Sequence, residues 1–279
     1  MKNFKTMVIP YFLWSILMVV IPMLLILVYA FTKEGNSVKT FVFTLENFEK
    51  FFSNQLFIDV LLRSLYIAIV TTLVCLLLGY PCAYFISKLN LRSQVWMILL
   101  ITFPTWINML VRTYAWRGIM DKNGLINSII TFFGFQPIKI LETSFAVILG
   151  MVYNFIPFMI LQIYNSLSKM DKSYIEAAAD LGANKALTFI KVIFPLSLPG
   201  VISGITLVFL PAVSSFFIPK LLGGGQYVLI GNLIENQFLT AGNWGFGGAI
   251  SLVMSIVIII SMYFARRLDK KYSSKGGSV

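Results

Sequence analysis

A polar segment with the sequence SYIEAAADLGANKALTFIKVIFPLSLPG, residues 173–200, carries the groups of this chain that are best suited to recognition chemistry. Glu176 and Asp180 supply two carboxylates, and three alanines lie between them. A carboxylate forms strong, charge-assisted hydrogen bonds with a basic residue of another protein. Small alanine side chains let a second surface approach closely. The residue types are therefore compatible with close packing against a partner surface.

The order of these residues predicts two short helices with a turn between them. Ser173 followed by Glu176 has the S-x-x-E spacing of a capping box, which starts a helix. Gly182 is expected to end or bend that helix, because glycine readily adopts a left-handed conformation. Asn184 is expected to cap a second helix that ends before Pro195. An ordinary amphipathic helix that joins two spans is the alternative interpretation.

Several residue types that catalysis or ion coupling would need are absent from the sequence. The chain has no histidine, and Cys75 and Cys82 both fall in the second apolar run, so neither a metal site nor a disulfide is expected. No Asp or Glu lies in any predicted span. Proton- or sodium-coupled carriers and membrane-embedded enzymes commonly use such groups. The sequence therefore predicts an energy source outside the membrane segments and no cofactor.

The composition is that of an integral membrane protein. Hydrophobic residues make up 58% of the 279 residues and charged residues 12%, whereas a soluble domain carries about a quarter charged residues. Six uncharged runs contain 19 to 30 residues each. About 20 helical residues cross a bilayer. We therefore expect an all-α protein with six transmembrane helices, at roughly 8–31, 64–87, 93–112, 144–167, 196–219 and 245–265.

The distribution of basic residues predicts the orientation of these spans. With both termini in the cytoplasm, 13 of the 22 lysines and arginines lie on the inner side. This agrees with the excess of positive charge found in cytoplasmic loops. The net charge of +11 is therefore a signal of topology, and no nucleic-acid partner is expected. Short amphipathic helices are expected in the outer loops around 33–60 and 113–143.

The segment around Glu176 resembles the EAA motif of bacterial ABC importer permeases. That motif reads E-A-A, three residues, G, nine residues, I-x-L-P; Glu176, Ala177, Ala178 and Gly182 match it, and the sequence VIFP ends it at Pro195. In that family the loop, here 168–195, is a coupling helix that binds a cytoplasmic ATPase. The resemblance assigns this role to Ser173, Glu176, Ala177, Ala178, Asp180, Gly182 and Pro195. The chain lacks the phosphate-binding G-x-x-x-x-G-K-[ST] sequence, so ATP would be bound by separate subunits.

Four further segments resemble one branch of these permeases, the spermidine/putrescine importers, and in particular their first permease subunit. They are FTLENFEKFF, GYPCAYFISK, DLGANKALTFIKVIFPLSLPG and LLGGGQYVLIGNLIENQFL. The resemblance covers nearly the whole chain. It implies a type I importer permease fold in a bacterial inner or plasma membrane. It also implies a sister permease, two ATPase subunits, an extracytoplasmic substrate-binding protein and a polyamine cargo.

Polyamines are flexible polycations that favour carboxylates and aromatic faces. Aromatic and amide side chains on the third and fourth spans are candidates to line the pathway: Trp106, Asn108, Tyr114, Tyr153, Asn154 and Tyr164. Residues of these types also serve as packing or interface residues in membrane proteins. An importer for another small solute, such as sulfate, molybdate or ferric iron, remains the alternative. A secondary transporter and a membrane enzyme are further alternatives.

Overall fold

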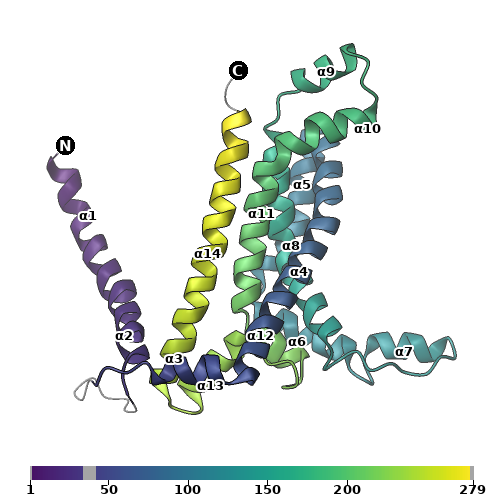
Figure 1. Cartoon of the computed structure of the whole chain (residues 1–279). Coiled ribbons are helices and arrows are strands. Elements are labelled where there is room, and N and C mark those ends of the chain that lie inside the picture. The colour runs from purple at the N-terminus through teal and green to yellow at the C-terminus, as the bar shows by residue number, and fades with distance from the viewer. Residues whose placement is uncertain (1, 34–41, 277–279) are drawn as a thin grey trace. The chain divides into compact units, whose positions relative to one another are not determined.

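The computed structural model describes residues 2–33 and 42–276, and almost all of them are helical (Figure 1). Within these ranges, Thr32 and Phe43 form an isolated antiparallel β-bridge. Five helices of the described residues are long and apolar enough to cross a membrane, and there are six crossings if a further pair of helices, bent by 90°, forms one span. The predicted fold class, an all-α membrane protein with several spans, is therefore confirmed. Membrane-length helices are Pro10–Ala30, Gln55–Lys88, Ser144–Ser168, Lys185–Ser214 and Trp244–Arg267.

The chain divides into two compact units, the first of which comprises Met1–Leu62 and Ile230–Ile258. Its helices are α1 (Lys2–Ser15), a π-helical turn (Ile16–Val20), α2 (Ile21–Ala30), α3 (Glu46–Ser53), the start of α4 (Gln55–Lys88), α13 (Ile230–Leu239) and the first part of α14 (Trp244–Gly276). The Asn47 side chain donates hydrogen bonds to the carbonyl oxygens of Ala30 and Thr32, both at 3.1 Å. Phe57 packs on Phe246, with ring centroids 5.0 Å apart. The Asn47 bonds hold α3 against the end of α2, and the Phe57 contact holds the start of α4 against α14.

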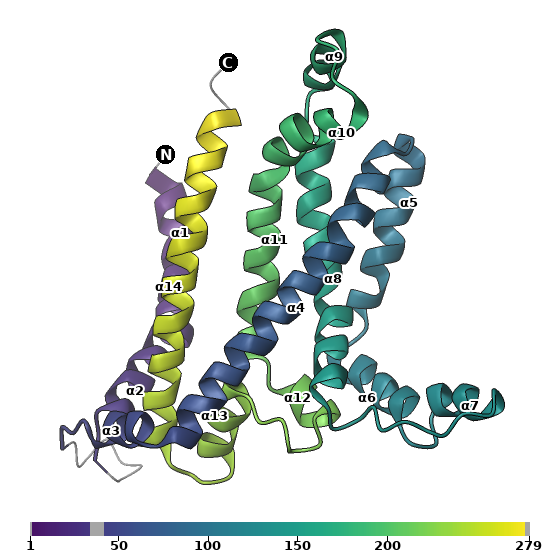
Figure 2. The same ribbon diagram turned by 45° about the vertical axis from the view of Figure 1, so that its right-hand side comes forward.

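The second unit comprises Arg63–Leu229 and Ile259–Val279 and contains both candidate sites. Its helices are most of α4, α5 (Leu91–Thr102), a 3-10 turn (Phe103–Trp106), α6 (Met109–Met120), α7 (Leu125–Phe132), α8 (Ser144–Ser168), α9 (Ser173–Asp180), α10 (Lys185–Thr188), a π-helical turn (Phe189–Ile193), α11 (Phe194–Ser214), α12 (Phe217–Leu222) and the end of α14. Figures 1 and 2 both show α9 and α10 at one end of α8 and α11, and α6, α7 and α12 at the other.

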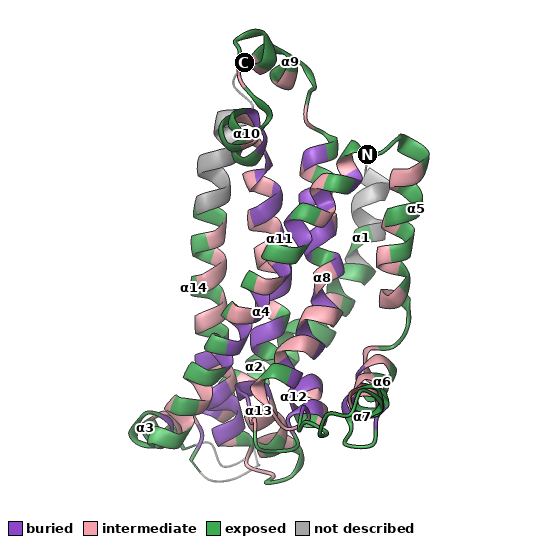
Figure 3. Ribbon diagram, turned by 90° about the vertical axis from the view of Figure 1, so that its right-hand side faces the viewer, coloured by how far each residue is buried: buried purple, intermediate pink, exposed green. Residues whose placement is uncertain are grey.

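The centre of the second unit is the pair α8 and α11, with α4 beside it. A Cβ atom at Gly204 would lie 2.6 Å from the sulfur of Met159, so glycine lets α11 pack closely on α8. The Tyr80 hydroxyl on α4 hydrogen-bonds the Ser197 hydroxyl on α11 at 2.8 Å, and both residues are buried. Figure 3 shows buried residues along α4, α8 and α11, whereas α5 contains none. Gln94 nevertheless joins α5 to α8, because its side chain accepts a hydrogen bond from the Tyr164 hydroxyl.

The third uncharged run does not form the single straight helix that was expected over 93–112. The helix ends at Trp106 and a new one begins at Met109, with a bend of 90° between the two parts. Pro104 lacks a backbone N–H, and the Asn108 side chain accepts a hydrogen bond from the Leu110 N–H, which starts α6. Hydropathy does not detect such a break, because all of these residues except Asn108 are compatible with a span.

Short helices occur in the loops that were predicted to lie on the outer side, as expected. The first is α3, although residues 34–41 of that loop lie outside the described ranges. In the second, α7 buries the polar side chain of Asn127 and exposes Phe132 and Ile129. The Asn127 amide accepts a hydrogen bond from the Ile138 N–H and donates to the Asp121 and Ile138 carbonyl oxygens. An apolar exposed face of this kind fits a helix at the membrane interface.

Candidate functional site

The turn between α9 and α10 has the geometry that the sequence predicted. Gly182 adopts a φ of +79°, in the left-handed region. The Gly182 N–H donates to the Ala179 carbonyl, and the Ala183 N–H donates to the Ala178 carbonyl, which together form a Schellman motif. Apart from Gly182 and its two chain neighbours, no atom of the described residues lies within 4 Å of the position that a Cβ would take there. The turn therefore needs glycine for its backbone conformation and not for space.

The start of α9 differs from the predicted capping box. Ser173 is the first residue of the helix, and Lys172 precedes it without a side-chain cap. The carboxylate of Asp171 instead accepts a hydrogen bond from the Ser173 N–H at 2.9 Å. This bond lowers the pKa of Asp171 below its usual value. The capping-box prediction was wrong because an aspartate two residues earlier reaches the same free backbone donors.

The end of the second helix also differs from the prediction. Asn184 caps α10 as expected, because its side chain accepts from the Leu187 N–H at 2.8 Å. The helix does not stop before Pro195, however. It continues through a π-helical turn into α11, and Pro195 lies in the first turn of α11. Proline is tolerated there, because the wider π-helical turn leaves its missing N–H without a required partner.

The exposed side of α9 and its turn forms the recognition surface that the carboxylates and alanines suggested. Glu176, Ala177, Asp180 and Gly182 are exposed, and Ala178 is half-buried. Leu181 follows them with 89% of its surface exposed, the most exposed of the large apolar residues described. An apolar side chain surrounded by small and acidic residues suits a protein contact better than bulk water.

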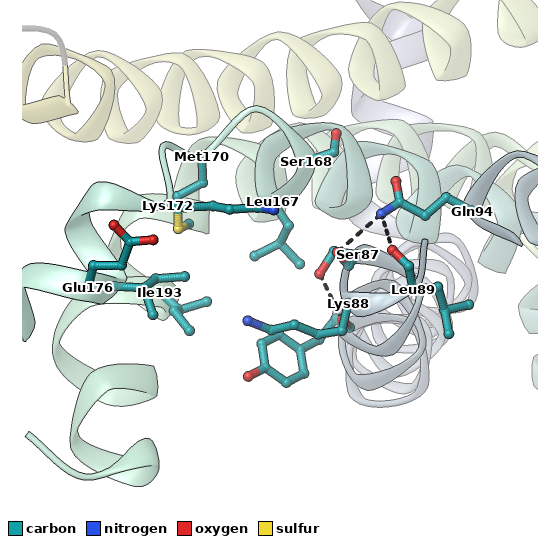
Figure 4. Close-up of a pocket in the computed structure, with 12 residues that line it drawn as sticks. Ser87, Lys88, Leu89, Gln94, Leu167, Ser168, Met170, Lys172, Glu176 and Ile193 are labelled. Atoms are coloured by element: carbon teal, nitrogen blue, oxygen red, sulfur yellow. Dashed lines mark hydrogen bonds between the residues drawn. The ribbon is translucent and has the colours of Figure 1, made fainter. Parts of the chain in front are cut away.

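A cavity of about 350 Å³ lies between α9 and the turn that joins α4 to α5. Figure 4 shows Glu176 and Lys88 on opposite sides of it, with Lys172 beside Glu176. At its far side, the Gln94 amide donates to the Leu89 carbonyl at 2.8 Å and accepts from the Tyr164 hydroxyl at 2.8 Å. Glu176 therefore has both an exposed carboxylate and basic side chains of its own chain nearby.

The candidate pathway residues separate into different environments. Tyr164 lies at the α9 end of α8, bonded to Gln94, and is apart from the other five. Trp106 and Tyr114 are 72% and 56% exposed. Asn108 caps α6. The six residues therefore do not form one site.

Tyr153 and Asn154 lie next to each other on α8 but differ in surroundings. The Tyr153 ring contacts Trp116 edge-on at 5.3 Å and lies under the guanidinium of Arg112, 5.9 Å from the ring centroid. Asn154 is 2% exposed, and its amide donates to the Gly150 carbonyl at 2.8 Å. Its Oδ1 atom is buried and has no hydrogen-bond partner among the described residues. The region around Tyr153 is thus polar at membrane depth.

Sequence reasoning missed Arg112, which belongs to this cluster. Its Nε and Nη1 atoms are buried and also have no hydrogen-bond partner in the described part of the chain. Arg112 served only to mark the end of an uncharged run, although a charge that borders a span is itself a signal of function. No group of metal-ligating side chains occurs within residues 2–33 and 42–276.

Comparisons with known proteins identify the family of this chain. Residues 75–274 match the family described as "Binding-protein-dependent transport system inner membrane component". The chain is 39% identical over 267 residues to the spermidine/putrescine transport system permease protein PotB of Haemophilus influenzae, an alignment that covers 95% of this chain and 93% of that protein. Its identity to PotB of Escherichia coli is 41% over 265 residues, covering 92% and 96%.

Solved structures show the same fold at low sequence identity. A bacterial ABC transporter that imports alginate has a chain with a TM-score of 0.81 and 14% identity, covering 97% of this chain and 96% of that one. A chain of the MetNI methionine ABC transporter has a TM-score of 0.59 and 16% identity, covering 77% and 95%. The fold is that of an ABC importer permease, and the chain belongs to the family of inner membrane components of binding-protein-dependent transport systems.

Proposed function

We propose that this chain is one of two permease subunits of an ATP-driven importer whose cargo is a polyamine such as spermidine or putrescine. The proposal rests on one observation above the others. The chain is 39% and 41% identical, over more than nine-tenths of its length, to permeases named for spermidine and putrescine transport. A more distant relative, 29% identical, is the inner membrane ABC transporter permease protein YdcU of Escherichia coli. Its name agrees with a permease subunit of an ABC transporter.

The predicted coupling loop, 168–195, supplies the contact with the ATPase. Support comes from the exposed α9, the left-handed turn at Gly182 and the exposed Leu181, which together present a small, rigid and partly apolar surface. Glu176, Ala177, Ala178 and Asp180 would face the ATPase, Gly182 would set the turn, and Pro195 would start the span behind it. Ser173 belongs to this loop as the first residue of α9, with Asp171 as its cap.

The remaining partners follow from this function. A sister permease would complete the pathway, two ATPase subunits would bind ATP, and an extracytoplasmic binding protein would deliver the cargo. Both termini and the coupling loop would lie in the cytoplasm of a bacterial cell, and the helices would cross its inner or plasma membrane. Membrane lipid would cover the remaining outer faces of the spans.

Cargo selection separates this proposal from its alternatives. Sulfate, molybdate and ferric iron are small inorganic ions, whereas a polyamine is an extended cation that binds aromatic faces and carboxylates. The absence of Asp and Glu from the predicted spans suits a pathway that passes a cation without retaining it. It also disfavours a secondary transporter, which would need an ion-coupling group in the membrane.

An uptake assay in cells tests the cargo. The chain would be expressed with its sister permease, ATPase and binding protein in a bacterium that lacks its own polyamine importers. We expect labelled spermidine or putrescine to accumulate, and unlabelled polyamines to compete. Sulfate, molybdate and ferric iron should not compete. Accumulation of one of these ions, with no accumulation of polyamine, would assign the chain to another importer.

A further inference from the structure

The bend after Trp106 places two short helices across the ends of the spans. α5 and the 3-10 turn contain 12 and 4 residues, a length of about 25 Å, which comes close to the ~30 Å of a hydrocarbon core. Trp106 is 72% exposed at the end of this segment, and tryptophan is typical of the boundary between hydrocarbon and head groups. The chain then turns by 90°, and α6 and α7 run across the ends of α8 and α11 (Figures 1 and 2). Both helices are therefore placed to lie along a membrane surface.

The exposed side of α7 consists of two stripes. Leu125, Ile129 and Phe132 are spaced by four and three residues, which puts them on one side of the helix, and they are 61%, 50% and 85% exposed. We call these three residues the apolar stripe. Ser128 and Thr131 are also exposed and lie on the neighbouring side. An apolar stripe beside a hydroxyl stripe is typical of a helix that lies at the boundary between lipid and water.

The opposite side of α7 is fixed to its own chain. Asn127 is 1% exposed there. Its amide donates to the Asp121 and Ile138 carbonyl oxygens at 3.2 and 3.0 Å and accepts from the Ile138 N–H at 2.9 Å. These bonds determine which side of the helix faces the protein, so the apolar stripe is held outward.

Three phenylalanines extend the apolar surface beyond the end of α7. Phe132, Phe133 and Phe135 are 85%, 69% and 70% exposed, and the first two rings meet edge-on at 5.6 Å. Gly134 has a φ of +82°, so the chain turns within this group. We call residues 132–135 the phenylalanine loop. Large aromatic side chains gathered on an exposed surface mark a site of contact with protein or membrane.

The charges around α7 limit how it can bind. The sequence has no charged residue from 123 to 138, and Lys122 and Lys139 border this stretch. Both lysines line a cavity of about 360 Å³ together with Asp121 and Glu142, and Lys139 pairs with Glu142 at 2.7 Å. Two positive and two negative groups give no net attraction to an anionic surface. Burial of apolar side chains therefore has to supply the binding.

We propose that α7 and the phenylalanine loop anchor the chain in the lipid leaflet at this end of the spans. The apolar stripe and the phenylalanine rings would lie among the acyl chains just below the head groups, and the bordering lysines at the level of the head groups. The partner is phospholipid, because an uncharged helix that projects along the membrane surface from the ends of the spans meets lipid first. The inference needs a membrane-spanning chain, and rests on the proposed function only to name the leaflet as the outer one.

The anchor supports the end of α8 that lies opposite the coupling loop. Trp116 on α6 contacts Tyr153 on α8 edge-on at 5.3 Å, and Met120 at the end of α6 is 1% exposed. A leaflet that holds α7 therefore also restrains α6 and the part of α8 around Tyr153. The two ends of α8 would then have different supports, lipid through α6 and α7 at one end and the ATPase through α9 at the other.

Spin labels on α7 test the anchor in the full-length chain. Ile129→Cys and Phe132→Cys report on the apolar stripe, and Ser128→Cys is the matched control on the same helix. Each variant, in a cysteine-free background, is labelled and reconstituted in phosphatidylcholine liposomes. Electron paramagnetic resonance then measures collisions with oxygen, which dissolves in lipid, and with a water-soluble nickel chelate. Labels on the stripe should meet the chelate about threefold less often than the label at Ser128, and oxygen more often.

The same measurement in the complex of both permeases and the ATPase, with and without the binding protein, identifies the occupant. Labels on the stripe that remain accessible to oxygen and protected from the chelate lie in lipid, as the proposal predicts. Protection from both reagents would mean that protein covers the stripe, and equal chelate collisions at the stripe and at Ser128 would mean water; either result overturns the proposal. Neither cargo nor ATP is used, so a wrong polyamine assignment would leave this test unaffected.

Replacement of the phenylalanines tests the source of the binding. Phe133→Ser combined with Phe135→Ser should raise chelate collisions of the label at position 129 about twofold or more, because less apolar surface enters the leaflet. Phe133→Leu combined with Phe135→Leu is the control and should keep them low. High salt should also leave them unchanged, since the charges beside α7 balance. A serine pair that behaves like the leucine pair, or release of the helix by salt, would overturn the proposal.

Discussion

At the scale of single residues, the structure separates groups that shape the backbone from groups that are free to act. Asp171 caps α9, so Glu176 is not needed to start the helix. Its carboxylate lies at the cavity that Lys88 and Lys172 also line. The sequence predicted both a capping role and a coupling role for Glu176. The capping role was wrong, because spacing alone does not say which of two nearby acceptors reaches a backbone N–H.

Glu176→Gln is the residue-scale prediction. Gln keeps the size and the hydrogen-bonding oxygen but removes the charge, so any effect must come from electrostatic contact with the ATPase or the nearby lysines. We expect lower substrate-stimulated ATP hydrolysis in the assembled complex. Asp171→Asn is the control, because it keeps an acceptor at the helix start, and its effect should be smaller. Equal effects of the two changes would leave Glu176 without a role in coupling.

At the scale of elements, the sequence predicted the helical content and the turn but not the breaks. Gly182 was identified because a left-handed turn after an alanine-rich helix needs glycine. The bend after Trp106 and the π-helical turn before Phe194 were missed. Both occur in segments whose residues are all apolar or compatible with a helix. In such segments the hydropathy does not change where a helix breaks or widens. Arg112 was missed for a related reason, since it needed a neighbour from α8 to become informative.

Gly182→Val is the element-scale prediction. A β-branched residue at a φ of +79° is strained by about 1–3 kcal/mol, and the open space around Gly182 excludes a steric clash as a second cause. We expect the protein to insert in the membrane normally but uptake to fail. Gly182→Asn should retain most uptake, because asparagine tolerates the left-handed region. Normal uptake with valine would show that the shape of this turn is not needed.

At the scale of the whole molecule, composition and the run of uncharged segments were sufficient to predict a multi-span membrane protein. The orientation of those spans came from basic residues alone. The pathway could not be predicted from this sequence alone, because under the proposed function its residues come from two subunits.

Thiol labelling tests the orientation. Cys75 and Cys82 are both unpaired, so their replacement by alanine gives a background without reactive thiols. A cysteine at Lys275 should be protected from a membrane-impermeant thiol reagent in intact cells, and one at Asn123 should react. Reaction at Lys275 with protection at Asn123 would invert the topology and move the coupling loop away from the ATPase.

ATP-driven uptake by the purified complex tests the central claim most directly. The two permeases and the ATPase would be reconstituted in proteoliposomes with the ATPase subunits facing the lumen. ATP would be enclosed in the lumen, and the binding protein would be added outside. The account predicts that labelled spermidine or putrescine accumulates with ATP and not with a non-hydrolysable analogue, and that Gly182→Val abolishes accumulation. Polyamine accumulation that needs no ATP, or ATP-driven accumulation of an inorganic anion in its place, would contradict it.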